Sequence, residues 1–154
     1  MIFQRINRSD PEKVFMVVKN IYSTAALTLG QSVQYDIASA KDGVSVTRPS
    51  ARATSAGFNY AGVVADPVIN INGYGLVQLY GYVPLANVRC TSGLKGSKPV
   101  VAGRPLCPNA AGSVFCLENT DTKSHNIEYY TVGFALGGNA SWTTKQIPIF
   151  LKAM

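Results

Sequence analysis

Residues 76–83, Leu-Val-Gln-Leu-Tyr-Gly-Tyr-Val, hold the pattern that decides the fold. Side chains two positions apart along a strand point to the same face of a sheet, so this stretch predicts a β-strand with two different faces. The apolar face carries Val77, Leu79 and Val83, and the other carries Gln78, Tyr80 and Tyr82. Two tyrosine rings side by side need a cover, either a neighbouring sheet or another subunit.

The same kind of pattern continues in both directions from this stretch, and helical periodicity is nearly absent. Residues 12–20 are apolar at both alternating sets of positions, which predicts a strand buried on both sides. Asp42-Gly43 predicts a hairpin turn, and Pro148 requires its strand to lie at a sheet edge or a bulge. Further strands are expected at 30–37, 44–47, 58–64, 68–71, 113–117, 127–136 and 146–151, and residues 91–109 are expected to form a long connection.

The sequence therefore predicts an all-β protein, or a mainly β protein with at most one short helix. The expected architecture is a compact antiparallel β-barrel or sandwich. No change of composition and no fixed repeat divides the chain. We expect residues 1–13 to form an N-terminal arm and residues 14–154 to form a single β domain.

Composition places the chain among folded proteins with a sparsely charged surface. Of its 154 residues, 47% are hydrophobic and 14% are charged, against about 25% charged residues in a typical soluble domain. No apolar run is long enough to span a bilayer and no export signal is visible, so no membrane contact is expected. Cys90, Cys107 and Cys116 match no disulfide framework or zinc pattern. They are expected to be reduced thiols in a protein made in a cytoplasm.

Charge is distributed unevenly along the chain, whose net charge is +6. No acidic residue lies between Asp66 and Glu118, while four basic residues do: Arg89, Lys95, Lys98 and Arg104. These four residues belong either to simple solvated loops or to a surface that docks on an acidic partner. Nucleic acid is the weaker choice of partner, because the basic loops hold no aromatic residue for base stacking.

No catalytic constellation stands out, so we expect a protein that is not an enzyme and needs no cofactor. The eight carboxylates are scattered, and the lone His125 lies in a polar stretch. A small hydrolase remains the weakest alternative. Its candidate groups would be His125 with Cys116 or Cys107, or Glu118 with Glu128.

Residues 58–119 carry a succession of strand ends and glycines with a recognisable order. The order runs through Phe-Asn-Tyr-Ala-Gly-Val-Val at 58–64, Gly-Tyr-Gly-Leu-Val-Gln-Leu-Tyr-Gly-Tyr at 73–82 and Val-Val-Ala-Gly-Arg-Pro-Leu at 100–106. Val-Gly-Phe-Ala-Leu-Gly-Gly at 132–138 and Ile-Pro-Ile-Phe-Leu at 147–151 continue it. Over residues 30–151 the chain resembles the capsid decoration, or cement, proteins of tailed bacteriophages. The three cysteines and the loop at 93–98 depart from that family's pattern.

The resemblance implies a virion protein, made in the host cytoplasm, that forms trimers and binds the outer surface of the major capsid lattice. Its expected partners are the major capsid protein and further copies of itself. The expected contact residues are Phe3, Arg5 and Ile6 in the arm, the face of Gln78, Tyr80 and Tyr82, and the basic loop residues Arg89, Lys95, Lys98 and Arg104. Another virion part, such as a head-fibre, tail or receptor-contact module, is the alternative.

Overall fold

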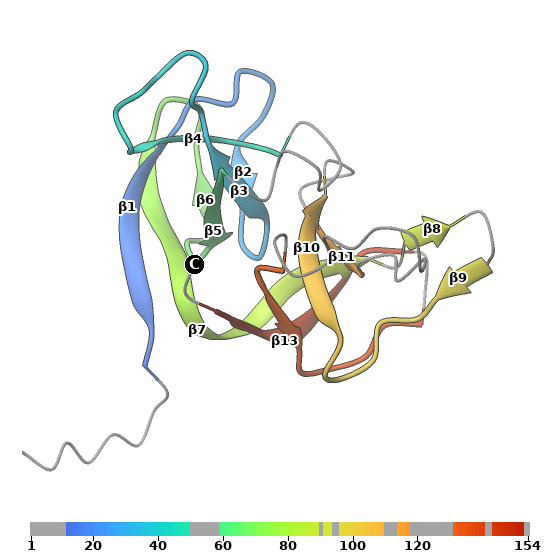
Figure 1. Cartoon of the computed structure of the whole chain (residues 1–154). Helices are drawn as coiled ribbons and strands as arrows, with labels where there is room; N and C mark the ends of the chain where they lie inside the picture. Colours follow the sequence, from blue (N-terminus) through green and yellow to red (C-terminus); the bar gives the residue numbers. More distant parts are fainter. Residues whose placement is uncertain are drawn as a thin grey trace, which may run out of the picture.

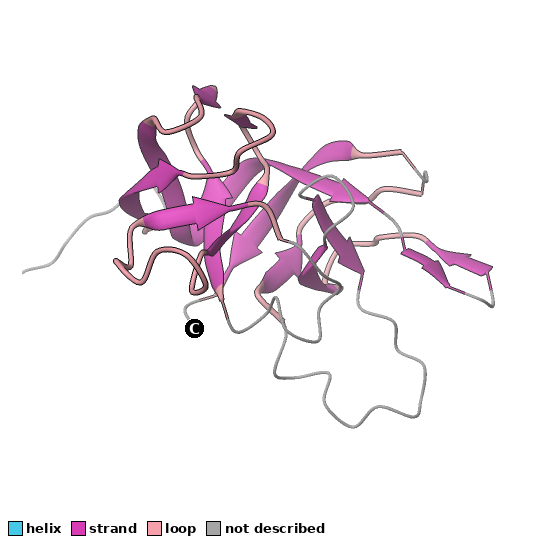
Figure 2. Cartoon of the chain, turned by 90° about the horizontal axis from the view of Figure 1, so that it is seen from above, coloured by secondary structure: helices cyan, strands magenta, loops and turns pink. Residues whose placement is uncertain are grey.

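The computed structural model describes residues 12–49, 59–89, 91–93, 96–109, 114–117, 131–140 and 143–152. Every regular element in these ranges is a β-strand (Figure 2). The prediction of an all-β, barrel-like fold is therefore confirmed. The predicted arm at 1–13 lies almost entirely outside the described residues, so that boundary stays a prediction.

Thirteen strands make up this part of the chain (Figure 1). They are β1 (Val14–Asn20), β2 (Leu27–Thr28), β3 (Ser32–Tyr35), β4 (Ser45–Thr47), β5 (Tyr60–Val64), β6 (Val68–Ile69), β7 (Tyr74–Arg89), β8 (Thr91–Gly93), β9 (Gly96–Lys98), β10 (Pro105–Asn109), β11 (Val114–Leu117), β12 (Gly133–Ala135) and β13 (Lys145–Leu151).

Two closed rings of five strands share the long strand β7. The first ring runs β1, β4, β3, β5 and the first half of β7, which pairs back to β1. The second ring runs from the second half of β7 through β11, β10 and β12 to β13, which pairs back to β7. Each ring contains one parallel pair, β1 with β4 and β7 with β11, and is otherwise antiparallel.

Each ring encloses its own apolar core, and β5 joins the two. The first core contains Val18, Leu27, Val33, Val46, Ala61, Val64, Ile69 and Val77. The second contains Val83, Ala86, Val88, Val100, Leu106, Val132, Ala135, Ile147, Ile149 and Leu151, together with Tyr60 and Val63 of β5. All five residues of β5 are buried, because this strand belongs to the first ring and also covers the second core.

Glycine is required where β7 passes from one ring to the other. Gly81 has a φ of 96°, in the region that L side chains rarely adopt. A β-carbon there would overlap the carbonyl oxygen of Glu12. The predicted common face of Val77, Leu79 and Val83 is wrong for this reason: Val77 and Leu79 belong to the first core, whereas Val83 lies in the second.

The sequence placed the end of β7 too early, at Val83, and the strand continues to Arg89. Pro84 lies within it, and the pairing of β7 with β13 is irregular between Ile147 and Ile149, which face Ala86 and Val83. Pro148 therefore faces the two residues Pro84 and Leu85 at one bulge, a place where the sheet tolerates residues without an N–H donor. The prediction that Pro148 lies at an edge or bulge is confirmed.

Two other expectations about strands need correction. Residues 91–109 are not one connection, since they hold the β8–β9 hairpin, which projects from the rest of the fold (Figures 1 and 2), and β10. Strand β1 is not buried on both sides, because Phe15 and Val17 are 45% and 54% exposed. The predicted hairpin at Asp42-Gly43 does join β3 to β4.

Candidate protein-contact surface

The predicted contact residues fall into different environments. Phe3, Arg5, Ile6 and Lys95 lie outside the described residues, as does the side chain of Lys98. Arg89 is half-buried at the end of β7, and Arg104 is exposed in the turn ahead of β10. Only two of the four basic side chains, those of Arg89 and Arg104, are described, so the predicted basic surface stays a prediction.

Gln78 does not contribute to an exposed face of this chain, contrary to the prediction. It is 4% exposed, and its amide Nε2 donates hydrogen bonds of 3.0 Å to the carbonyl oxygens of Tyr80 and Tyr82. These bonds lie across the turn of the backbone at Gly81, so Gln78 braces the passage of β7 between the rings. Its role is internal because its donor capacity is already used.

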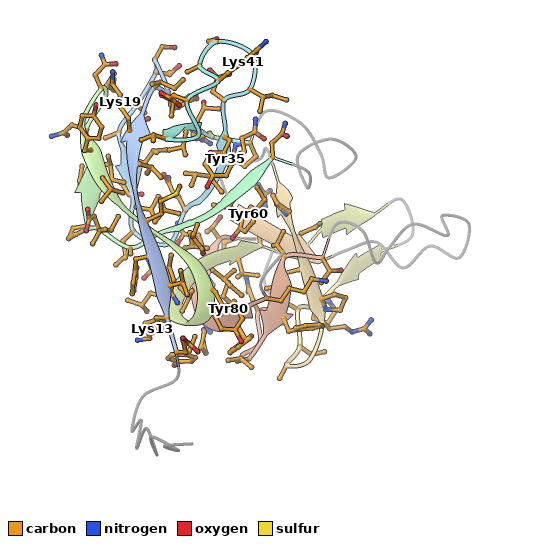
Figure 3. The ribbon with its side chains drawn as sticks, turned by 60° about the vertical axis from the view of Figure 1, so that its left-hand side comes forward. Lys13, Lys19, Tyr35, Lys41, Tyr60 and Tyr80 are labelled. Atoms are coloured by element: carbon orange, nitrogen blue, oxygen red, sulfur yellow. The ribbon has the colours of Figure 1, made fainter. Side chains whose placement is uncertain are left out.

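Tyr80 and Tyr82 are half-buried, and residues of the same chain cover them in part. The ring of Tyr80 meets Phe150 of β13 edge-on, with centroids 5.5 Å apart. The Lys13 ammonium lies 6.0 Å from the centre of the Tyr82 ring, a cation–π distance. Figure 3 shows Lys13 and Tyr80 at the same end of the β1–β7 pair. A neighbouring strand thus supplies the cover that the sequence required.

An aromatic row crosses three strands near this point. In the register of the sheet, Phe134 of β12 faces Phe150 of β13, which in turn faces Tyr82 of β7. Directly paired residues lie on the same face of a sheet, so the three rings form one line. Phe134, at its outer end, is 41% exposed.

A second apolar surface covers the outside of the β1–β7 pair, and we call it the outer apolar face. It consists of Phe15, Val17, Tyr74 and Leu76, each between 39% and 67% exposed. Val17 is directly paired with Leu76, so both side chains lie on the outward side of the sheet. Exposed apolar surface of this extent is typical of a protein–protein contact.

One long edge of β1 adds to this surface. Along Val14 to Val18, β7 is the only described strand that pairs with β1, since β4 pairs with it only at Lys19 and Asn20. Figure 1 shows β1 at the outer margin of the fold. An unpaired apolar edge is a template for pairing with another chain. The sequence did not reveal this open edge, because an uninterrupted apolar run such as residues 14–18 also fits a strand buried on both sides.

The whole fold is similar to that of a known phage structural protein. The chain shares its fold with a head-fibre domain. The match is to the head fiber gp8.5 N base of bacteriophage phi29, at a TM-score of 0.50 and 9% sequence identity. It covers 92% of this chain and 95% of that chain. No protein-family model matches the sequence, and no curated protein matches it either.

Most of the side chains that the sequence offered for catalysis lie outside the described ranges. His125, Glu118 and Glu128 lie outside them, as does the side chain of Cys116, whereas Cys107 is buried in β10. No three His, Cys, Asp or Glu side chains gather as a metal site within the described ranges. Where the structure describes the chain, it holds no helix long and apolar enough to cross a membrane.

Proposed function

We propose that this chain is a structural protein of a phage virion, fixed to the outside of the head. The observation that carries the proposal is the likeness in fold to a phage head-fibre base over nearly the full length of both chains. The sequence resemblance to capsid decoration proteins supports the same location. The role is non-enzymatic: it needs contact area rather than a catalytic pocket.

The finer proposal is a decoration protein that trimerises and binds the major capsid protein. Stable contacts between proteins bury upwards of about 1,000 Å². The outer apolar face and the aromatic row offer large apolar and aromatic side chains of the kind that dominate such contacts. Trimer formation predicts a particle of three times 16.4 kDa in light scattering.

A second candidate is the base domain of a head fibre, and the phi29 match favours it specifically. The two candidates differ in what lies above the capsid. A decoration protein is complete as a bound trimer, whereas a fibre base carries further projecting material. Images of the particle surface distinguish them.

Co-sedimentation with heads tests the proposal. Heads assembled from the major capsid protein of the same genome are mixed with the chain and pelleted. We expect the chain to pellet with them, and the variant Phe15→Ser/Val17→Ser/Leu76→Ser to bind at least about tenfold more weakly, since central apolar contacts contribute about 1–2 kcal/mol each.

The matched control is Val68→Ser/Ile71→Ser, which changes two residues that are 53% and 44% exposed outside the outer apolar face. It should pellet like the unchanged chain. Circular dichroism establishes that both variants remain folded. A chain that stays in the supernatant at every concentration would contradict the proposal.

A further inference from the structure

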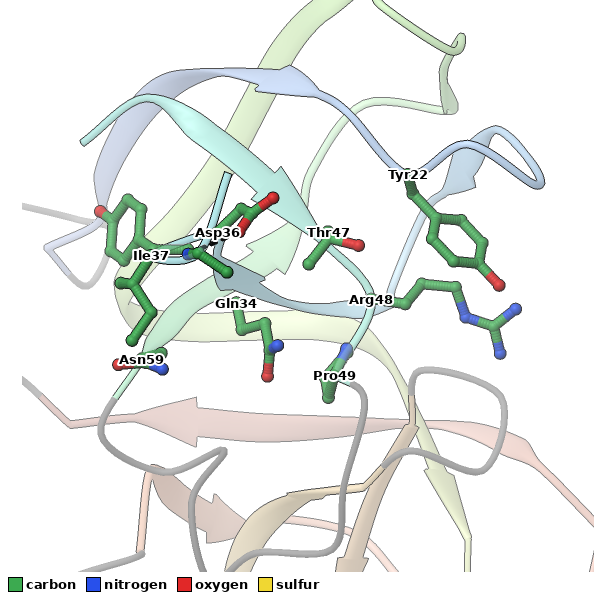
Figure 4. A pocket seen from close by; sticks show the side chains of 10 residues that line it. Tyr22, Gln34, Asp36, Ile37, Thr47, Arg48, Pro49 and Asn59 are labelled. Carbon is green, nitrogen blue, oxygen red and sulfur yellow. Dashed lines mark hydrogen bonds between the residues drawn. The ribbon is translucent and has the colours of Figure 1, made fainter. Parts of the chain in front are cut away.

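A hollow of about 580 Å³ lies on the side of the first ring away from the outer apolar face. Its volume falls within the range of roughly 300–1,000 Å³ that small-molecule sites occupy. Its walls come from β3, β4, the start of β5 and the segment after β1. Figure 4 shows the residues that the next steps use: Tyr22, Gln34, Thr47, Arg48, Pro49 and Asn59.

The strand register holds these side chains in place. Gln34 of β3 is directly paired with Thr47 of β4, so both lie on one face. The N–H of Tyr35 donates a 2.7 Å bond to the carbonyl of Asn59, which brings the start of β5 alongside. Tyr22 is fixed through its N–H, which donates to the side-chain oxygen of the fully buried Asn20. The site is therefore built on paired strands.

Polar groups in this hollow have hydrogen-bonding capacity that the protein itself does not use. The side chains of Gln34, Thr47 and Asn59 are half-buried, and in the described part of the chain they make no hydrogen bond. Because they border an open hollow, solvent reaches these groups and a ligand can replace that solvent. Each of the three can both donate and accept, so together they suit a ligand rich in groups of the same kind.

Charge and shape narrow the class of that molecule. The guanidinium of Arg48 lies 5.3 Å from the centre of the Tyr22 ring, and together they form one wall. Among the described lining residues, the only carboxylate is that of Asp36, which accepts N–H bonds from Ala38 and Ser39. These described residues supply one cation and one anion, a balance that disfavours a polyanion. The polar lining disfavours a lipid, while the Tyr22 and Pro49 rings suit the C–H faces of a sugar.

We propose that this hollow binds a neutral saccharide. Its hydroxyls match the amides of Gln34 and Asn59 and the hydroxyl of Thr47, which can each donate and accept. The site is separate from the outer apolar face, so a virion protein could engage a glycan while docked through its other side. This activity goes beyond attachment to the head and does not depend on it.

Nuclear magnetic resonance of the full isotopically labelled chain tests the proposal. The probes are neutral trisaccharides of glucose, galactose, mannose, rhamnose and N-acetylglucosamine, with inorganic phosphate as the anionic comparison. We expect at least one saccharide to shift the side-chain amide signals of Gln34 and Asn59 saturably at millimolar concentration. Gln34→Ala and Thr47→Val should each weaken that binding by about three- to tenfold, the loss expected for one hydrogen bond.

Gln146→Ala is the matched control, because Gln146 is exposed on β13 of the second ring, away from the hollow. This variant should bind the saccharide like the unchanged chain. Three results overturn the proposal. They are that no saccharide in the panel shifts these signals, that the Asn59 signal responds to the saccharide equally in Gln34→Ala, Thr47→Val and the unchanged chain, or that only phosphate shifts the signals. Retained signal dispersion shows that the variants are folded, and the assay does not involve heads.

Discussion

Strands β1 and β13 occupy equivalent positions in the two rings but have different surroundings. Each is seven residues long and pairs antiparallel with one half of β7. β13 is also paired with β12, and its Phe150 is half-buried in the aromatic row. Among the described strands, only β7 lies beside β1 along Val14 to Val18, and the outward side chains of β1 are exposed. Both rings are closed, but β13 has a strand along each side, whereas most of β1 keeps one edge open to a partner.

The largest loss of stability is expected at Gly81, where β7 passes from the first ring to the second. Gly81→Val should lower the free energy of unfolding by about 4 kcal/mol or more, because the side chain meets the Glu12 carbonyl at a positive φ. Gly43→Ala is the control: its φ is also positive, at 68°, but nothing lies within 4 Å of the added carbon. It should cost about 1–2 kcal/mol. Equal losses in urea unfolding would refute the role given to Gly81.

Equivalent leucines in the two cores provide the next test. Leu27→Ala in the first core and Leu106→Ala in the second core each remove a fully buried side chain and should each lower the free energy of unfolding by about 2–5 kcal/mol. Since β5 and β7 belong to both rings, either variant should shift one common unfolding transition. Calorimetry measures this. Two separate transitions, each sensitive to only one variant, would show that the rings fold independently.

Each half of the fold contains a buried asparagine whose side chain donates two hydrogen bonds to backbone carbonyls, and the effects of replacing the two can be compared. Asn20 Nδ2 donates to Ile69 O at 2.9 Å and to Ala25 O at 3.4 Å, while Asn139 Nδ2 donates to Val88 O and Thr143 O at 3.0 Å. Replacement by alanine should cost about 1–3 kcal/mol at either site, because buried carbonyls lose their partners. Thermal unfolding checks this, and a loss below about 0.5 kcal/mol would contradict it.

The smallest effect is a pH dependence confined to the first ring. The Asp42 carboxylate accepts hydrogen bonds from the N–H groups of Ser45 and Val44 and from the Ser45 hydroxyl, which lowers its pKa to about 2. A lowered pKa contributes stability above the unfolded pKa of about 3.9, and this stability is lost as pH falls through about 2.

Hydrogen exchange of the β3–β4 hairpin, followed from pH 5 to pH 2, measures this dependence. Protection should fall in the unchanged chain as the pH decreases, and it should fall less in Asp42→Asn. The β12–β13 pair of the second ring provides the comparison and should respond equally in both proteins. An identical pH response of the hairpin in the two proteins would remove the assignment to Asp42.

The sequence predicted the elements better than their surroundings. Alternation and turn residues located β1, β3, β4, β5, β11 and β13, because period-two patterns and Asp-Gly turns act locally. The full length of β7 was missed because a proline such as Pro84 normally ends a strand, whereas here it lies at a bulge in the pairing with the distant strand β13. The burial of Gln78 and the exposure of Phe15 depend on which strands lie alongside them. The local sequence pattern does not predict these neighbours.

The candidate surfaces were predicted only in part for the same reason. Tyr80 and Tyr82 are half-buried, and the residues that cover them, Phe150 of β13 and Lys13 ahead of β1, are far apart in the sequence. The hollow is similar: Tyr22, Gln34, Thr47 and Asn59 are scattered polar residues until the β4–β3–β5 register gathers them.

Electron cryomicroscopy of heads carrying the bound chain tests the central claim most directly. The account predicts density for the two-ring fold on the outer capsid surface, with β1 and the outer apolar face against a neighbouring protein subunit. Density inside the head, or a bound chain whose β1 face points to solvent with no neighbour, would contradict it.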